Sequence, residues 1–314
     1  MSEHAQQIRD AVGRAVVGQR DVIEQVIVAF LAGGHVLLEG APGMGKTLLV
    51  LAMARAIGGR FARIQFTPDL MPADVTGHTL FDPNTGKFTV RRGPVFCNLL
   101  LADEINRAPA KTQAALLEVM AEQQVTIEGT SFTLKPPFMA LATQNPIEQE
   151  GTYPLPEAQL DRFLLKVIMD YPSAVEEAEI VSAVTAGRTG ARLDASATEQ
   201  VVDVEGAAAL QQEVAAVRVE PRVIDYAVRL VRATRETSGV AVGAGPRGAI
   251  ALVRAGRARA WLQGRDFMTP DDVKALARPA LRHRILLAPE LEIEGLRPDD
   301  VLARLLESVD APRQ

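Results

Sequence analysis

The sequence predicts an α/β fold in its first half, with a parallel sheet between helices, and an all-helical second half. Up to residue 172, short apolar runs alternate with helical patterns, which is typical of parallel strands covered on both faces. From residue 173 onward, apolar residues recur almost entirely at helical spacing. We therefore expect two domains, residues 1–172 and residues 173–314.

Four short apolar runs in the first half are the expected strands: His35–Leu38, Arg63–Phe66, Asn98–Ala102 and Phe138–Thr143. A helical pattern from Leu48 to Ile57 follows the first of them. Two insertions, residues 76–94 and 125–136, contain the turn signals Pro-Asn-Thr-Gly and Glu-Gly between β-like arms, so we expect two hairpins. Whether they are plain surface hairpins or functional arms is open from these residues alone.

The second half begins with a helix-capping pattern. Ser173 precedes Glu176 by three residues, the spacing of a capping box, and this marks the expected boundary between the domains. Three later helices each begin at a proline, which is favoured in a first helical turn: Pro221–Thr237, Pro246–Gln263 and Pro270–Leu287.

Composition limits the functional classes. The chain has 314 residues, of which 47% are hydrophobic and 23% charged, so it can bury a large core. One cysteine, Cys97, gives neither an internal disulfide nor metal-ligand spacing, which fits a reducing cytoplasm. The N-terminal residues do not form a secretory signal, and no run is long enough to span a bilayer. A net charge of −5 argues against general attraction to nucleic acid or anionic membranes.

The segment GAPGMGKT, from Gly40 to Thr47, lies between an expected strand and an expected helix. This is the context of a phosphate-binding loop, in which glycines let backbone N–H groups turn toward phosphates and the helix N-terminus favours negative charge. Lys46 would bind the phosphates and Thr47 would bind Mg²⁺. An ordinary glycine-rich turn is the alternative, and the flanking elements disfavour it.

Two acids end the apolar run Leu99–Ala102. Asp103 and Glu104 would lie at the carboxyl edge of the parallel sheet, where the glycine loop also opens. There Asp103 can hold Mg²⁺ through a water and Glu104 can polarise the water that attacks the γ-phosphate. Acids that only cap the next helix are common, but the glycine loop makes that interpretation the weaker one.

Two further residues are candidates for a hydrolysis site. Asn145 follows another expected strand, so its amide could orient the attacking water, although Asn-Pro is also a common turn pair. Arg162 lies among apolar residues in LPEAQLDRF, and an arginine beside a γ-phosphate can accelerate hydrolysis by about 10³-fold or more. A solvated arginine paired with Asp161 is the alternative.

With these motifs in this order, the chain resembles the MoxR family of AAA+ ATPases over nearly its full length. The resemblance is carried by GAPGMGKT (Walker A), LLLADE (Walker B) followed by INRAP, ATQNP, and LPEAQLDRF. Two longer segments, residues 102–118 and 144–163, are specific to this family. The resemblance implies an AAA+ P-loop core with a C-terminal all-α lid, and ATP and Mg²⁺ as cofactors.

The resemblance also implies residue roles. Asn145 matches sensor 1, Arg162 the arginine finger that reaches a neighbouring subunit, and Arg247 in GAGPRGA the sensor 2 arginine of the lid; Gly245 stands where the family more often has serine. The expected catalytic residues are Lys46, Glu104, Asn145 and Arg162, and the expected metal ligands are Thr47 and Asp103. The expected nucleotide-binding residues are Val17, Gly18 and Gln19 near the adenine, Gly40, Pro42, Gly43, Met44, Gly45, Lys46, Thr47, Leu48 and Arg247.

In function, the resemblance implies a homo-hexameric ring that hydrolyses ATP and remodels or assembles other proteins, often with a partner that carries a von Willebrand factor A domain. The two hairpins would face the ring centre, with Phe81, Lys87 and Phe88 as candidates to contact a partner. An AAA+ motor on nucleic acid is the main alternative, but no dense basic face supports it. A GTP switch is disfavoured because no Asn-Lys-x-Asp motif occurs, and a small-molecule kinase would not need Arg162 from a neighbour.

Overall fold

The centre of the molecule is a five-stranded parallel sheet in the order β2-β5-β8-β1-β9. The computed structural model describes residues 3–84, 86–145, 151–185, 195 and 198–312. The strands are β1 (Val36–Gly40), β2 (Phe61–Gln65), β5 (Leu99–Asp103), β8 (Met139–Gln144) and β9 (Leu165–Met169). The first four confirm the expected strands to within a few residues.

Both faces of this sheet are covered, which explains why the inner strands β1, β5 and β8 are largely apolar, whereas the edge strand β2 carries Arg63 and Gln65. In β1, Leu38 faces one core cluster and Leu37 faces the other, and β5 alternates in the same way. The first face packs on α1 (Glu3–Ala15), α2 (Arg20–Leu31) and α3 (Lys46–Ala56), and the second on α5 (Ala110–Glu122). The predicted sheet between helices is therefore confirmed.

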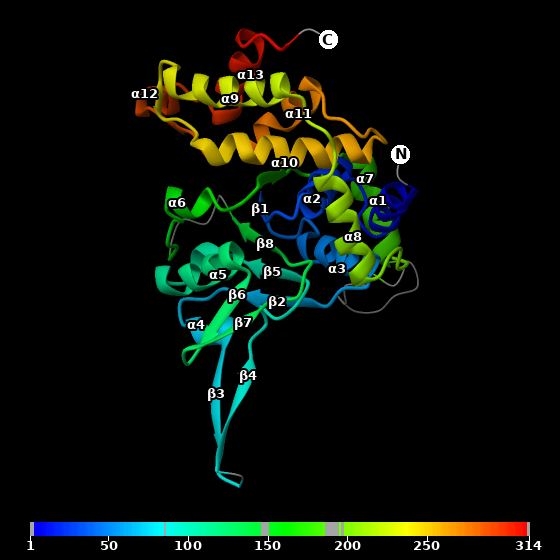
Figure 1. Ribbon diagram of the computed structural model, residues 1–314, viewed down its shortest axis with the longest axis vertical. Coiled ribbons are helices and arrows are strands. Elements are labelled where there is room, and N and C mark those ends of the chain that lie inside the picture. The colour runs from blue at the N-terminus through cyan, green and yellow to red at the C-terminus, as the bar shows by residue number, and fades with distance from the viewer. Residues whose placement is uncertain (1–2, 85, 146–150, 186–194, 196–197, 313–314) are drawn as a thin grey trace.

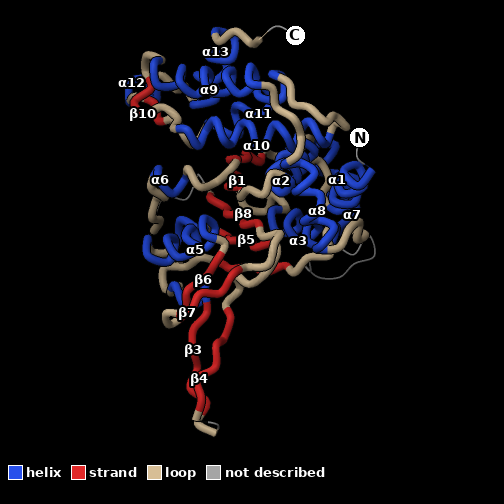
Figure 2. Tube along the Cα trace, in the orientation of Figure 1, coloured by secondary structure: helices blue, strands red, loops and turns tan. Residues whose placement is uncertain are grey.

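Two antiparallel hairpins extend from the second face, as the turn signals predict. Strands β3 (Gly77–Asp82) and β4 (Lys87–Arg92) follow the short helix α4 (Pro72–Thr76) and form an arm that projects far from the body (Figures 1 and 2). Strands β6 (Gln124–Ile127) and β7 (Thr130–Thr133) form the second hairpin, with Glu128 and Gly129 both at positive φ in its turn.

The second half is mainly helical. Its elements are α7 (Ala174–Thr185), α8 (Val204–Ala215), α9 (Pro221–Glu236), α10 (Pro246–Leu262), α11 (Pro270–Leu281), α12 (Pro289–Ile293) and α13 (Pro298–Ser308), with a small β10 (Val240–Val242) and β11 (Leu286–Leu287) pair. The capping box before α7 forms as the spacing predicts, since the Ser173 N–H and hydroxyl both donate to Glu176 Oε2 at 2.8 Å.

Some elements differ from the sequence prediction, among them the small β10–β11 pair in the second half. Strand β9 is not among the expected strands, and Lys166 interrupts its apolar run. The helix expected over residues 270–287 ends at Leu281 instead. Beyond that point His283 and Arg284 bind the backbone of Phe163, and Leu286 and Leu287 pair with β10, so tertiary contacts stop the helix.

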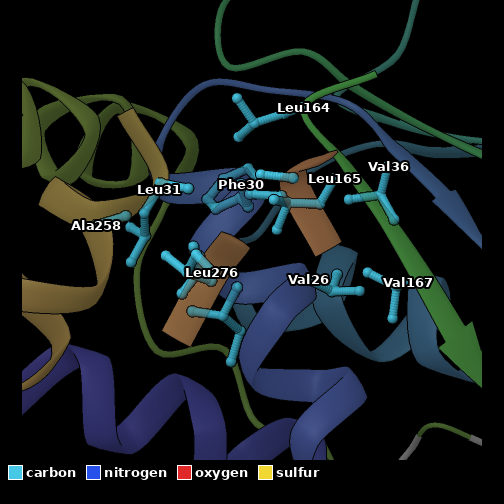
Figure 3. Close-up of a cluster of buried hydrophobic side chains, with 14 of the residues drawn as sticks. Val26, Phe30, Leu31, Val36, Leu164, Leu165, Val167, Ala258 and Leu276 are labelled. Atoms are coloured by element: carbon cyan, nitrogen blue, oxygen red, sulfur yellow. The ribbon is translucent and has the colours of Figure 1, made fainter. Parts of the chain in front are cut away.

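One apolar core joins the sheet to the C-terminal helices (Figure 3). Phe30 and Leu31 of α2 and Leu165 of β9 lie in the same buried cluster as Ala258 of α10 and Leu276 of α11. The C-terminal helices therefore rest directly on the edge of the sheet that carries β1 and β9.

Among the described residues, no helix is long and apolar enough to cross a membrane.

Candidate nucleotide-binding site

The glycine loop connects β1 to α3 and has the backbone geometry that a phosphate cradle needs. Gly43 and Gly45 have φ of 83° and 81°, a region that favours glycine, and no atom lies within 4 Å of where their Cβ atoms would be. Gly45 is also the N-cap of α3, so the free N–H groups of an eleven-residue helix open onto the loop. A cavity of about 330 Å³ lies over this loop.

Lys46 lies at the start of α3, and its Nζ donates to Gly40 O at 2.6 Å, across the loop. Burial lowers the pKa of Lys46, while the nearby carboxylates of Asp103, Glu104 and Glu39 act to raise it. A half-buried ammonium with so few direct partners is stabilised when an anion arrives. This is the electrostatic setting in which lysine binds phosphate.

One buried hydroxyl bonds to both members of the acid pair at the end of β5, Asp103 and Glu104. Thr143 Oγ1, on the neighbouring β8, donates to Asp103 Oδ1 at 2.7 Å and accepts from the Glu104 N–H at 2.8 Å. Glu104 has a left-handed backbone, with φ of 55°, at the point where the chain leaves β5 and enters a short 3-10 turn, Ile105–Arg107. The β5–β8 pairing therefore fixes the Asp103 carboxylate and the backbone of Glu104.

Three residues at this site were missed by the sequence reasoning: Arg63, Gln65 and Thr143. Arg63 Nη2 pairs with Asp103 Oδ2 at 2.6 Å, and Gln65 Nε2 donates to Glu104 Oε2 at 2.8 Å. Polar residues at alternate positions near the end of a strand are the signal that could have revealed the first two. Their proximity to the acids depends on β2 pairing with β5, which the sequence does not state.

The predicted phosphate-loop and acid residues come together around one cavity, with Asn145 among them. It is lined by Pro42, Gly43, Met44, Gly45, Lys46, Thr47, Leu48, Arg63, Gln65, Asp103, Glu104, Thr143 and Asn145. Backbone donors, one lysine, a threonine hydroxyl and two carboxylates form the donor set that a triphosphate and Mg²⁺ require, because Mg²⁺ keeps several waters and takes few protein ligands. The residues present therefore fit both groups.

The segment Val17–Gln19 lies beside this cavity without lining it. Gln19 Nε2 donates to Asp170 O at 3.0 Å, and Asp170 follows Met169, the residue of β9 that pairs with Gly40. Gly18 has φ of 79° and lies against Glu176 at the start of α7. The segment is thus fixed between the end of the sheet and α7, one strand away from the glycine loop.

Arg162 and Arg247 lie elsewhere, in a second cavity of about 330 Å³ that they share with Arg254 and Arg284. Arg162 Nη1 donates to Leu117 O at 2.6 Å, and Arg247 lies 3.6 Å from Asp161 Oδ2. Asp161 is the one acid among the described residues lining this cavity, so the surface is basic. The structure does not bring either arginine into the cavity of Lys46 in the same chain.

Known protein families, relatives and a solved structure match this chain. Residues 35–165 match the model of the ATPase family associated with various cellular activities (AAA), and residues 232–305 match the AAA lid domain. The chain is 44% identical to Chaperone MoxR1 of Mycobacterium tuberculosis (96% of this chain, 81% of the relative) and 34% identical to Protein MoxR of Methylorubrum extorquens (96% and 93%). A solved structure of a protein from Cytophaga hutchinsonii superposes with a TM-score of 0.90 at 40% identity, covering 99% of this chain and 96% of that one.

The matched families are an ATPase core and a helical lid, and the relatives match over most of their lengths. These matches agree with the phosphate-binding geometry of the Lys46 cavity. The chain belongs to the MoxR family of AAA+ ATPases.

Proposed function

We propose that the chain forms a homo-hexameric ring, which hydrolyses ATP with Mg²⁺ at its subunit interfaces. The ring uses the free energy of ATP hydrolysis to remodel or assemble partner proteins. The observation that carries the proposal is the separation of two basic elements. Lys46 lines one cavity, whereas Arg162 and Arg247 line another. An arginine that cannot reach its own chain's phosphates can serve those of a neighbouring copy.

Within one chain, the polar groups of the Lys46 cavity divide the work of binding and hydrolysis in this proposal. Lys46 and the loop N–H groups hold the phosphates, while Thr47 and Asp103 hold Mg²⁺, which when bound neutralises phosphate charge. Glu104 orients and deprotonates the attacking water. Its Oε2 accepts from Gln65 and from Arg107, which leaves Oε1 as the oxygen that can accept from a water. Asn145, which lines the same cavity, contributes its amide to that water.

We propose that two parts of the chain move against each other, a core of residues 1–172 and a lid of residues 173–314. ATP and ADP can favour different lid positions only through different contacts in each position. Arg254 of α10 donates to the carbonyls of Ala32 and Gly33 at 2.6 and 2.9 Å, and the lid shares its apolar core with α2 and β9 (Figure 3). These contacts support small shearing movements, because packed interfaces slide between discrete arrangements.

The β3–β4 arm is the proposed contact to a protein substrate or partner. Phe81 and Phe88 lie opposite each other with ring centroids 5.2 Å apart, and their side chains are 55% and 73% exposed. Exposed aromatic pairs on a projecting arm are typical of protein contacts. We propose a separate protein with a von Willebrand factor A domain as the partner and the cytoplasm as the location, the latter from the single cysteine.

Mixing two inactive variants tests the shared site. Arg162→Ala keeps an intact Lys46 cavity but offers no finger, whereas Lys46→Ala offers a finger but binds ATP poorly. We expect little phosphate release from either variant alone and a clear recovery of steady-state ATPase activity in the mixture. As the matched control, Arg218→Ala removes an exposed arginine outside both cavities, and it should retain full activity by itself.

The result that contradicts the proposal is a mixture that co-assembles, as mass measurements show, yet recovers no activity. Arg162 would then act within its own chain or not at all. Strong, salt-sensitive stimulation of the ATPase by DNA would instead favour the motor on nucleic acid.

A further inference from the structure

Among the longer helices of the described residues, α7 stands apart because none of its twelve residues is buried, although most of them are apolar. Val175, Val181 and Val184 are 70%, 60% and 57% exposed. At 100° per residue, Val175, Ala178 and Val181 form an outward stripe opposite the half-buried Glu176 and Ile180. A helix that turns an apolar stripe to solvent is expected to pack against something else.

The flanks of this stripe are acidic. Glu177 and Glu179 lie on either side of it by helical spacing, and both are exposed. The surface offered by α7 is therefore a narrow apolar ridge between two carboxylates. Its natural complement is an apolar groove with basic edges.

Such a groove lies between α9 and α10, which run side by side along the lid (Figure 1). It has a volume of about 600 Å³, and three of its apolar residues, Ile224, Val228 and Ile250, are 43%, 39% and 55% exposed. The groove is lined by four arginines, at positions 232, 235, 254 and 257, and among the described residues no acid lines it. Arg257 Nε is buried there and makes no hydrogen bond.

We propose that the α9–α10 groove receives α7 of a second copy of this chain. The valine ridge would cover Val228 and Ile250, and Glu177 and Glu179 would face the groove arginines. This inference rests on the proposed ring, because it requires copies of the chain to meet through two different surfaces. A contact between unlike surfaces is head-to-tail, and it closes into a ring when the rotation permits.

The positions of the two surfaces support one common interface. The groove shares Ile250 and Arg254 with the cavity that contains Arg162, so it adjoins the surface that would offer the finger. Helix α7 starts against Gly18, in the segment fixed beside the glycine loop. A neighbour whose Lys46 cavity meets Arg162 would therefore carry its α7 toward the groove.

A cross-link between two differently tagged chains tests this contact directly. One chain carries Val181→Cys and the other carries Ile250→Cys, so a disulfide between them must be intermolecular. The native Cys97 does not compete, because it is buried and burial raises the pKa of its thiol to about 12. We expect a covalent dimer on mild oxidation with ATP and Mg²⁺, and none when Ile293→Cys, an exposed lid position outside the groove, replaces Ile250→Cys.

Charge reversal provides a second, independent readout. Glu177→Arg and Arg232→Glu change exposed side chains, so both variants should fold. Each variant alone should shift the assembled mass toward the monomer, and the double variant should restore the assembly. Ile250→Glu should also weaken assembly, and the Glu177→Arg change is not needed to see this effect.

The outcomes separate this inference from the proposed ring. If the chain assembles and mixed Arg162→Ala and Lys46→Ala subunits recover ATPase activity, but no cross-link forms and Ile250→Glu assembles normally, α7 docking is wrong and the ring stands. If Ile250→Glu assembles normally but loses activity toward a partner protein, the groove binds that protein instead of α7. A chain that remains monomeric with ATP overturns both proposals.

Discussion

Thr143→Val is the most informative single change at the Lys46 cavity, because it removes one hydroxyl and keeps the shape of the side chain. Thr143 is 1% exposed, and its Oγ1 makes one bond to Asp103 Oδ1 and one to the Glu104 N–H. Valine can make neither bond. The change therefore loosens both acids while keeping the shape of the cavity wall, of which Thr143 is a part.

The magnitude follows from the two bonds. A buried N–H left without an acceptor costs about 1–3 kcal/mol, and a hydrogen bond to a carboxylate is worth about 1.5–3 kcal/mol. Asp103 stays partly exposed and keeps its bond to Arg63, so water can replace part of the loss. We expect a loss of about 2–3 kcal/mol in unfolding free energy and a fall in kcat of about 10- to 100-fold, the usual effect of removing a residue that orients a metal-site ligand.

The assay is phosphate release as a function of ATP and of Mg²⁺, together with urea unfolding of the same preparations. Thr143→Ser is the matched control, since it keeps the hydroxyl and should retain most of the activity and Mg²⁺ dependence. The reasoning is refuted if Thr143→Val loses stability as expected but keeps the kcat and Mg²⁺ dependence of the wild type. The hydroxyl would then stabilise the fold without positioning the acids.

Three further changes test other parts of the structure. Glu104→Gln keeps the shape but loses the basic oxygen, so kcat should fall by about 10²-fold or more while binding of a fluorescent ATP analogue persists; an active variant would exclude Glu104 as the base. Burial lowers the pKa of His35 from 6.5 to about 4, so only the unfolded chain gains a proton in this range, and stability should fall by up to about 3 kcal/mol as pH drops from 6.5 to 4. His35→Gln should flatten this fall in pH-dependent unfolding, though not completely, because burial also lowers the pKa of His283; an unchanged profile would contradict it. Asp272 is fully buried between Arg259 and Arg265, so Asp272→Ala should cost about 3 kcal/mol in urea unfolding, with Asp272→Asn intermediate; equal stability of all three proteins would contradict the buried ion pairs.

The sequence predicts those features that depend on local pattern. The glycine loop, four strands, both hairpins and the capping box before α7 follow from turn chemistry, apolar runs and short spacings, and these are properties of neighbouring residues. Lys46, Thr47, Asp103 and Glu104 could be recognised because each lies at the end of a predicted strand or the start of a predicted helix.

Other features depend on which strands and helices meet, and no local pattern states that. Arg63 and Gln65 lie at the site only because β2 pairs with β5, and Thr143 connects the two acids only because β8 is the next strand. β9 and the early end of α11 are set by contacts more than 100 residues apart, such as that of His283 with Phe163. The sequence by itself determined the phosphate loop and the sheet that holds it. The separation of Arg162 from Lys46 was decided by the parallel pairing of β9 with β1, which puts Arg162 at the end of these strands opposite the glycine loop, and the position of Arg247 was decided by how the lid packs on the core. Both depend on contacts between distant segments, whose free energy no single segment contains.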